Sequence, residues 1–192
     1  GKGYSPLAKE VYDAFAYADS KGVLLVHAAG NSSENIDVEK NFPTSMYEFQ
    51  TKKLDHFLTI GASTRYAKVK KQAYGELAAP FSNYGQTHVD VFAPGYEIYN
   101  AVPQSAYMQL QGTSMAAPMV TGAAALLKSY FPKLSMKEIK DILLSSATSY
   151  KGSQQQKPGE NTPVDFGTLS VTGGVINLPA AVKAAMALEA TK

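Results

Sequence analysis

The order of two apolar patterns near the start of the chain constrains the fold most strongly, because a helical pattern runs directly into a strand pattern. One helical face collects four apolar side chains: Leu7, Val11, Phe15 and Ala18. Ser5-Pro6 is typical of a helix N-terminus, and Gly22 is typical of a helix end. The apolar residues 23–26 that follow predict a short buried strand. A helix followed at once by a buried strand indicates an α/β layered fold.

Strand and helix patterns continue to alternate along the chain. Further strands are predicted at residues 57–60, 89–92 and 166–171. Further helices are predicted at residues 113–130, from the capping box of Ser135 and Glu138 onward, and at 179–189. Residues 30–56, 65–88 and 151–163 are predicted to be loops, and loops this long inside a compact domain usually carry function. We therefore expect an α/β domain with a mainly parallel sheet flanked by helices.

Composition excludes several classes of function. The chain has 192 residues, 45% of them hydrophobic and 10% aromatic, which are values of a globular domain rather than of a disordered one. The net charge of +2 creates no field that attracts nucleic acid or a membrane surface, and the cluster Lys68, Lys70 and Lys71 is interpreted as a solvated loop. No cysteine is present, which excludes disulfides and thiol catalysis. No apolar run is long enough to cross a membrane. We predict neither a nucleic-acid partner nor a membrane partner.

The most informative stretch is the heptapeptide Gly112-Thr113-Ser114-Met115-Ala116-Ala117-Pro118. A serine in the first turn of a helix holds its hydroxyl oxygen exposed on a rigid element, as a nucleophile requires. The free N–H groups of that turn favour a developing negative charge. Gly112 lets a substrate backbone approach closely, and Pro118 is expected to fit because the first turn has no N–H bond to lose. A serine before a helix is far more often a structural cap than a nucleophile, so the serine alone decides nothing.

The complete heptapeptide resembles the Gly-Thr-Ser-Met-Ala-x-Pro signature of the subtilases, a family of serine proteases. Alanine at position 116 excludes the G-x-S-x-G elbow of α/β-hydrolases. Three further segments resemble the family: residues 81–85, 91–95 and 173–177. The resemblance implies a partial subtilisin-like fold, a polypeptide substrate, and hydrolysis of peptide bonds through an acyl-enzyme at Ser114.

A second segment, Val26-His27-Ala28-Ala29-Gly30-Asn31, also resembles the family. On its own, a Gly-Asn pair after a strand is a turn. The resemblance assigns Asn31 to the oxyanion hole, where an amide can donate a hydrogen bond without ionising. It also implies that Ala28, Ala29 and Gly30 form one wall of the primary specificity pocket, and that Gly112 and Thr113 contact substrate.

The other members of the catalytic triad are not recognisable in the chain. Subtilases order the triad Asp, His, Ser, so both partners of Ser114 must lie upstream of it. The family's Asp-Thr/Ser-Gly and His-Gly-Thr motifs do not occur in this sequence. His27 is expected to pack in the core, and His56 and His88 are expected in surface loops. Asp90 matches a structural aspartate of the family.

Without a base, a serine hydroxyl is a weak nucleophile at neutral pH, so we expect the chain alone to be inactive. The chain begins Gly1-Lys2-Gly3, with no Met and no signal-peptide pattern. Residues 1–192 are therefore expected to be the C-terminal portion of a subtilase catalytic domain. The expected partner is the missing N-terminal portion with its Asp and His. Without it, uncovered sheet edge is expected to cause self-association.

Two other functions remain open. The chain could belong to a pseudoenzyme or protein-binding module on a subtilase scaffold, in which case the upstream Asp and His motifs would be missing. A generic α/β domain that binds a small ligand is less well supported, because Gly30-Asn31 and Gly173-Gly174 are isolated and no phosphate-binding loop occurs. The residues before Gly1 discriminate between an enzyme and a pseudoenzyme.

No cofactor is predicted. Asn35, Asp37 and Glu39 place oxygen ligands in one loop, as a calcium site requires, but solvated polar side chains are the ordinary interpretation and no calcium site is assigned. Subtilases are mostly exported, which implies an extracytoplasmic or secreted location.

Overall fold

The computed structural model describes residues 7–39, 41–50, 52–68 and 75–192. Its helices are α1 (Ala8–Ser20), α2 (Thr113–Tyr130), α3 (Met136–Ser145) and α4 (Leu178–Glu189), with a 3₁₀ helix η1 (Phe166–Thr168). Its longer strands are β1 (Leu25–Ala28), β2 (Phe57–Tyr66), β4 (Val91–Pro94), β5 (Ile98–Val102) and β6 (Ala106–Leu110). The short strands are β3 (Glu76–Ala78), β7 (Thr148–Ser149), β8 (Gln154–Gln156), β9 (Pro163–Asp165) and β10 (Gly174–Val175). Ser5-Pro6, predicted to open the first helix, and Lys70 and Lys71 of the basic cluster lie outside the described residues.

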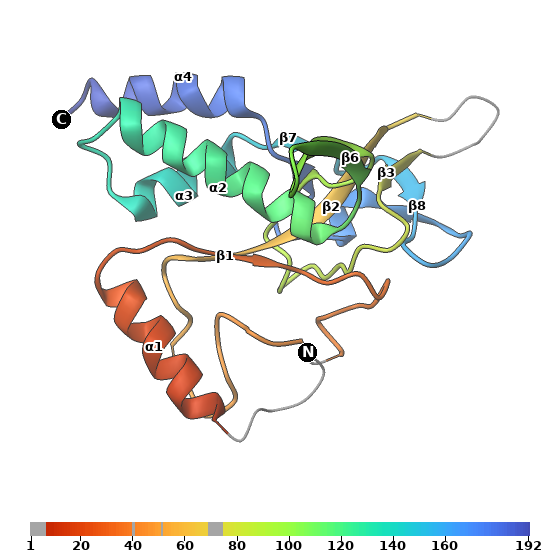
Figure 1. The fold of residues 1–192 in the computed structure, drawn as a ribbon, viewed down its shortest axis with the longest axis horizontal. Helices are drawn as coiled ribbons and strands as arrows, with labels where there is room; N and C mark the ends of the chain where they lie inside the picture. Colours follow the sequence, from red (N-terminus) through yellow and green to blue (C-terminus); the bar gives the residue numbers. More distant parts are fainter. Residues whose placement is uncertain (1–6, 40, 51, 69–74) are drawn as a thin grey trace.

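A mainly parallel sheet forms the centre of the molecule, with strand order β1-β2-β4-β10-β7. Strands β1, β2, β4 and β10 run parallel to their neighbours, whereas β7 and β3 add antiparallel strands to β10 and β2. Figure 1 shows α2, α3 and α4 on one side of β1 and β2, and α1 on the other. This arrangement confirms the predicted α/β fold with a mainly parallel sheet flanked by helices.

Helix α2 packs on the sheet through one face. Its buried residues are Thr113, Ala116, Ala117, Val120, Ala123, Ala124 and Leu127. They join a core that includes Leu58 and Ile60 of β2 and Val91 of β4. Small side chains let the helix approach the sheet closely, which positions its first turn at the end of β4. The opposite face of α2 is exposed.

The expectation for Pro118 was wrong. Helix α2 begins at Thr113, so Pro118 lies inside the helix and beyond its first turn. In a regular helix, residue 118 would donate its N–H to the carbonyl of Ser114. Proline has no N–H, so the carbonyl of Ser114 lacks that intrahelical donor.

Several loop and strand predictions also need correction. The range 65–88 contains the end of β2 and all of β3, which pair with each other. The range 151–163 contains β8, which pairs with β9. Residues 166–168 form η1 rather than a strand, because the Asp165 side chain accepts a hydrogen bond from Gly167 N and caps the turn. The hairpin of β5 and β6 had not been predicted.

Helix ends were predicted correctly where a capping box or a glycine marks them in the sequence. Ser135 Oγ accepts from Glu138 N, and the Glu138 carboxylate accepts from Ser135 N, so the predicted capping box is present. Gly22 follows α1 with a positive φ of 69°. The strand after it begins only at Leu25, and β1 is half-buried rather than buried because it lies at the edge of the sheet.

Candidate active site

Ser114 lies exposed in the first turn of α2, at the carboxyl edge of the parallel strands. The start of the helix is tied to the end of β4, because Gly112 N donates to Gly95 O at 2.8 Å. A β-carbon on Gly95 would lie 2.7 Å from Gly112 O, so only glycine allows these two backbones to meet. The Ser114 hydroxyl is therefore held on the first turn of a helix that is anchored to the sheet, which is the position predicted for it.

Asn31 follows β1 at the same edge of the sheet and contacts the residue before the serine. Its Oδ1 accepts hydrogen bonds from Thr113 N at 2.9 Å and from Thr113 Oγ1 at 2.8 Å. The same Thr113 hydroxyl accepts from Gly30 N at 3.1 Å. Thr113 is 1% exposed, so these bonds lie away from water. They join two segments that are more than 80 positions apart in the sequence.

The bonds to Thr113 also orient the amide nitrogen of Asn31. With Oδ1 occupied, Nδ2 lies 3.2 Å from the point where a β-carbon on Gly112 would stand. The backbone nitrogen of Ser114 lies 3.7 Å from the same point. Two nitrogens therefore border one small space, which is open because residue 112 is glycine. Gly112 has φ 149° and ψ 161°, a conformation that favours glycine.

The segment Ala28–Gly30 is held by two asparagines that the sequence analysis missed. The carbonyl oxygen of Ala29 accepts from Asn83 Nδ2 at 2.9 Å and from Asn41 Nδ2. Ala29 itself is fully buried. Asn83 lies within the segment 81–85 that resembled the subtilases, and this was the only signal that pointed to it.

The Subtilase family model matches residues 1–167. The chain belongs to the subtilase family. Subtilisin DY of Bacillus licheniformis is 35% identical over 150 residues, which are 78% of this chain and 47% of that protein. The thermophilic serine proteinase of Bacillus sp. (strain AK1) is 38% identical over 117 residues, 61% of this chain and 24% of that protein.

Solved structures agree at the level of the fold. A chain of the subtilase cytotoxin SubAB assembly superposes with a TM-score of 0.74 at 21% identity, covering 98% of this chain and 57% of that chain. The A-subunit of the AB5 toxin from E. coli gives a TM-score of 0.72 at 21% identity, covering 96% of this chain and 58% of that chain. This subtilase chain spans about half the length of subtilisin DY and of these structural relatives.

The three histidines of this subtilase have different surroundings. His27 packs against the ring of Phe57, with its Nδ1 buried and without a hydrogen-bond partner, and burial lowers its pKa to about 4. His56 Nδ1 lies 3.1 Å from Asp19 Oδ1. His88 Nδ1 lies 2.9 Å from Asp37 Oδ1. His88 is exposed as predicted, whereas His27 is half-buried on the edge strand β1 rather than in the core, and the His56 side chain is only 16% exposed.

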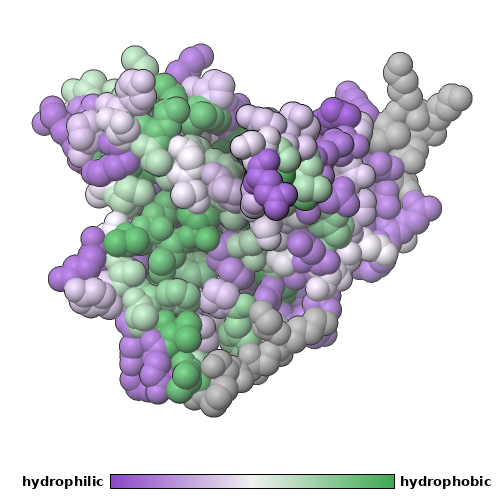
Figure 2. All heavy atoms as spheres, viewed as in Figure 1, coloured by the Kyte–Doolittle hydropathy of each residue, from purple (hydrophilic) through white to green (hydrophobic). Residues whose placement is uncertain are grey.

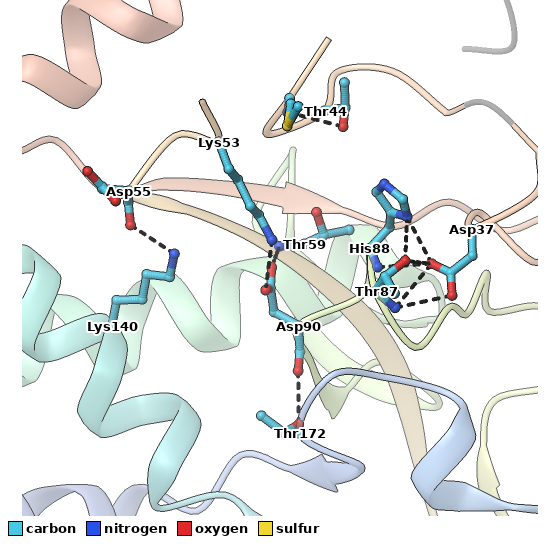
Figure 3. A network of polar contacts seen from close by, with 11 residues as sticks. Asp37, Thr44, Lys53, Asp55, Thr59, Thr87, His88, Asp90, Lys140 and Thr172 are labelled. Atoms are coloured by element: carbon cyan, nitrogen blue, oxygen red, sulfur yellow. Dashed lines mark hydrogen bonds and ion pairs between the residues drawn. The ribbon is translucent and has the colours of Figure 1, made fainter. Parts of the chain in front are cut away.

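Asp90 connects the sheet to the loops around it, as Figure 3 shows. Its carboxylate accepts from Thr59 N at 2.7 Å and lies 3.9 Å from Lys53 Nζ, while its carbonyl accepts from Thr172 Oγ1 at 2.9 Å. Burial raises the pKa of Asp90, and the Lys53 ammonium opposes that rise. These contacts to backbone and to Lys53 fit a structural aspartate.

Two of the three oxygen ligands considered for calcium, Asn35 and Asp37, are used within the protein. Asn35 Oδ1 accepts from Asp37 N, and the Asp37 carboxylate accepts from Thr87 and His88 (Figure 3). Burial raises the pKa of Asp37, but the hydrogen bonds from Thr87 and His88 outweigh it and leave that pKa lowered. Across the described ranges, no group of three or more His, Cys, Asp or Glu side chains could hold a metal ion. Within the same ranges, no helix is long and apolar enough to cross a membrane.

Proposed function

We propose that this chain is the nucleophile-bearing C-terminal portion of a subtilisin-like serine endopeptidase catalytic domain. The observation that carries the proposal is the pairing of exposed Ser114 with Asn31 through Thr113. Family membership supports the reaction class, and the local geometry supports the individual roles. In this proposal Ser114 is the nucleophile, and the Asn31 amide and the Ser114 N–H form the oxyanion hole.

The proposed chemistry is acyl transfer. Ser114 Oγ attacks the carbonyl carbon of the scissile peptide and forms a C–O bond, while a general base takes the hydroxyl proton. The carbonyl oxygen becomes an oxyanion in the space between Asn31 Nδ2 and Ser114 N, where both nitrogens can donate to it. Collapse breaks the C–N bond, and the leaving amine takes the proton. Water then attacks the ester, which releases the acid and regenerates Ser114.

Substrate positioning is assigned to the segments on either side of this space. Ala28 and Gly30 form one wall for the side chain that precedes the scissile bond, with the fully buried Ala29 behind it. Gly112 borders the reacting carbonyl, while the buried Thr113 holds Asn31 in place. Gly30 has φ 104°, which favours glycine, and the space that a β-carbon would take there is occupied by the Asn83 and Asn41 amides. A polypeptide is the substrate implied by this wall and by the family.

The general base is proposed to come from a segment that precedes this chain in the same catalytic domain. His56 and His88 pair with Asp19 and Asp37, and burial disfavours a proton on His27. In the part of the chain that the structure describes, none of these histidines hydrogen-bonds to Ser114. An extracytoplasmic location accompanies this proposal, and fractionation of the producing cells tests it.

Labelling with a fluorophosphonate serine probe tests the proposed function. We expect the full-length protein to be labelled at Ser114, the 192-residue chain to stay unlabelled, and Ser114→Ala to abolish labelling. Ser129→Ala is the matched control, because Ser129 is an exposed serine on the same helix and its loss should leave labelling intact. Absence of labelling in the full-length protein would favour a pseudoenzyme or protein-binding module. Stoichiometric labelling of the 192-residue chain would mean that the base lies within it.

A further inference from the structure

We infer that Asn83 is a positioning residue for the oxyanion hole, holding the backbone on both sides of Asn31 in the geometry that the reaction needs. This inference rests on the proposed function, and it concerns a residue that does not touch the reacting atoms. Asn83 lies between β3 and β4, while Asn31 follows β1, so the two come together only in the folded chain.

The Asn83 side chain bonds to three backbone groups that surround Asn31. Its Nδ2 donates to Ala29 O at 2.9 Å. Its Oδ1 accepts from Ser32 N at 3.0 Å and from Glu34 N at 3.0 Å. The Asn83 backbone adds a fourth bond, from its N–H to Gly30 O at 2.9 Å. The backbone before and after Asn31 is therefore fixed by one residue.

Burial makes these bonds difficult to replace with water. Asn83 is 2% exposed, and a β-carbon on Gly30 would lie 2.5 Å from Asn83 Nδ2. Glycine at position 30 thus allows the amide to approach the backbone closely. A buried amide with both ends hydrogen-bonded defines the path of the chain, because breaking either end leaves a polar group without a partner.

Asn83 is itself anchored to the centre of the sheet. Ser82 Oγ donates to Asn83 O at 2.8 Å and accepts from Ala62 N of β2 at 3.0 Å. Ser82 is fully buried. A continuous set of hydrogen bonds therefore runs from β2 through Ser82 and Asn83 to the segment around Asn31.

The bonds continue from that segment to the nucleophile. Gly30 N donates to Thr113 Oγ1, and Thr113 Oγ1 donates to Asn31 Oδ1. A displaced backbone at residues 29–34 would move Asn31 Nδ2 away from the space that it shares with Ser114 N. A small misplacement of a donor weakens stabilisation of the transition state more than binding of the ground state, because the oxyanion forms only during the reaction.

The experiment is a double-mutant cycle in the full-length protein, with kcat and KM for a peptide substrate measured per active site titrated by the fluorophosphonate probe. We expect Asn83→Ala to lower kcat by about 10–100-fold and to change KM by less than about threefold. In an Asn31→Leu background, the same substitution should lower kcat by less than about threefold, because its effect acts through the Asn31 amide. Asn83→Asp keeps the shape and the acceptor but loses the donor to Ala29 O, and serves where the alanine variant does not fold.

Gln155→Ala is the matched structural control. Gln155 is also a fully buried amide that bonds to backbone, accepting from Leu77 N and donating to Ala67 O. Its loss should reduce stability without lowering kcat per titrated site.

The possible outcomes distinguish the positioning role of Asn83 from the proposed function. Loss of activity on Asn31→Leu with unchanged kcat in both Asn83 variants would overturn the positioning role and leave the proposed function standing. An equal loss of kcat from Asn83→Ala with and without Asn31 would show a general structural role and would also overturn it. A full-length protein that neither cleaves nor labels would overturn both.

Discussion

The amide nitrogen of Asn31 lies 3.2 Å from the point where a β-carbon on Gly112 would stand. That point is also 3.7 Å from Ser114 N, so a side chain at position 112 would occupy the space that the proposed oxyanion hole needs. The φ of 149° at Gly112 adds backbone strain to any replacement. The glycine of the heptapeptide therefore keeps a binding space open and allows the backbone conformation at the start of α2.

Gly112→Ala is expected to lower kcat of the full-length protein by about 10²–10³-fold, the range seen when a serine protease loses one oxyanion donor. Steady-state kinetics per titrated active site measures this loss. The control is Gly122→Ala in the exposed part of the same helix, where an added β-carbon meets nothing within 4 Å. That variant should keep its activity and gain about 0.5–1 kcal/mol of stability, since glycine is a poor helix former. Full activity in Gly112→Ala would contradict the placement of the oxyanion hole.

Met115 adjoins the nucleophile, and its Sδ lies 3.7 Å from the same open point at Gly112. Oxidation to the sulfoxide adds an oxygen and polarity beside the proposed site. Peroxide is therefore expected to lower activity of the full-length protein, and Met115→Ala should resist this loss. Met186→Ala is the control, because Met186 is 59% exposed on α4 and should not alter the response to peroxide. Equal inactivation of the Met115→Ala variant and the unmodified protein would contradict the placement.

Helices and strands were predicted correctly where a few neighbouring residues carry the pattern that specifies them. The capping box of Ser135 and Glu138 and the apolar start of β2 were found from neighbouring residues alone. The second half of β2 was missed because residues such as Ser63 and Thr64 carry no apolar alternation. The hairpin of β5 and β6 was missed for a related reason. Its residues are exposed or half-buried throughout, and Gln104 and Ser105 form its turn with positive φ but without glycine.

The residues of the candidate site also fall into a group that short sequence motifs predicted and a group that only the fold brings together. Ser114 and Asn31 were predicted because short strings around them resemble a family. Asn83 and Asn41 were not predicted, because their bonds to Ala29 O join residues that are 54 and 12 positions apart. An asparagine that follows a serine in a loop is typical of an ordinary turn. Only the folded chain shows that its amide is buried against the backbone beside Asn31.

His27 gives the stability of the chain a pH dependence. Burial lowers its pKa from 6.5 to about 4, so the native state resists protonation while the unfolded chain binds a proton below pH 6.5. This contribution to stability is complete above pH 6.5 and is lost as the pH falls toward 4. The loss is at most about 3.5 kcal/mol, because a tenfold difference in proton affinity between the folded and unfolded chain corresponds to roughly 1.4 kcal/mol.

Urea unfolding of the 192-residue chain at pH 7.5 and pH 4.5 measures this dependence. His27→Phe keeps an aromatic ring beside Phe57 and removes both the titration and the unpartnered Nδ1. The variant should lose less stability than the unmodified chain between these two pH values. The same loss in both proteins would show that other groups cause the acid sensitivity.

The last prediction concerns the surface that this chain leaves exposed. Strand β1 lies at the edge of the sheet with half-buried residues, and Figure 2 shows apolar residues gathered around it. An apolar groove of about 460 Å³ lies between α2 and α4. It is lined by Leu126, Tyr130, Phe131, Val182 and Met186. In the proposed full-length protein, we expect the preceding part of the domain to cover the edge of β1.

The 192-residue chain alone is therefore expected to self-associate in a concentration-dependent manner, or to rearrange these exposed segments, because an uncovered sheet edge and apolar groove favour contact with another chain. Light scattering across a wide range of concentrations measures the association. A double variant, Leu126→Glu with Met186→Glu, should weaken it by placing charges in the groove. Val38→Glu is the control, because Val38 is 76% exposed and does not line the groove. A chain that stays monomeric throughout, with its exposed segments as described, would contradict this prediction.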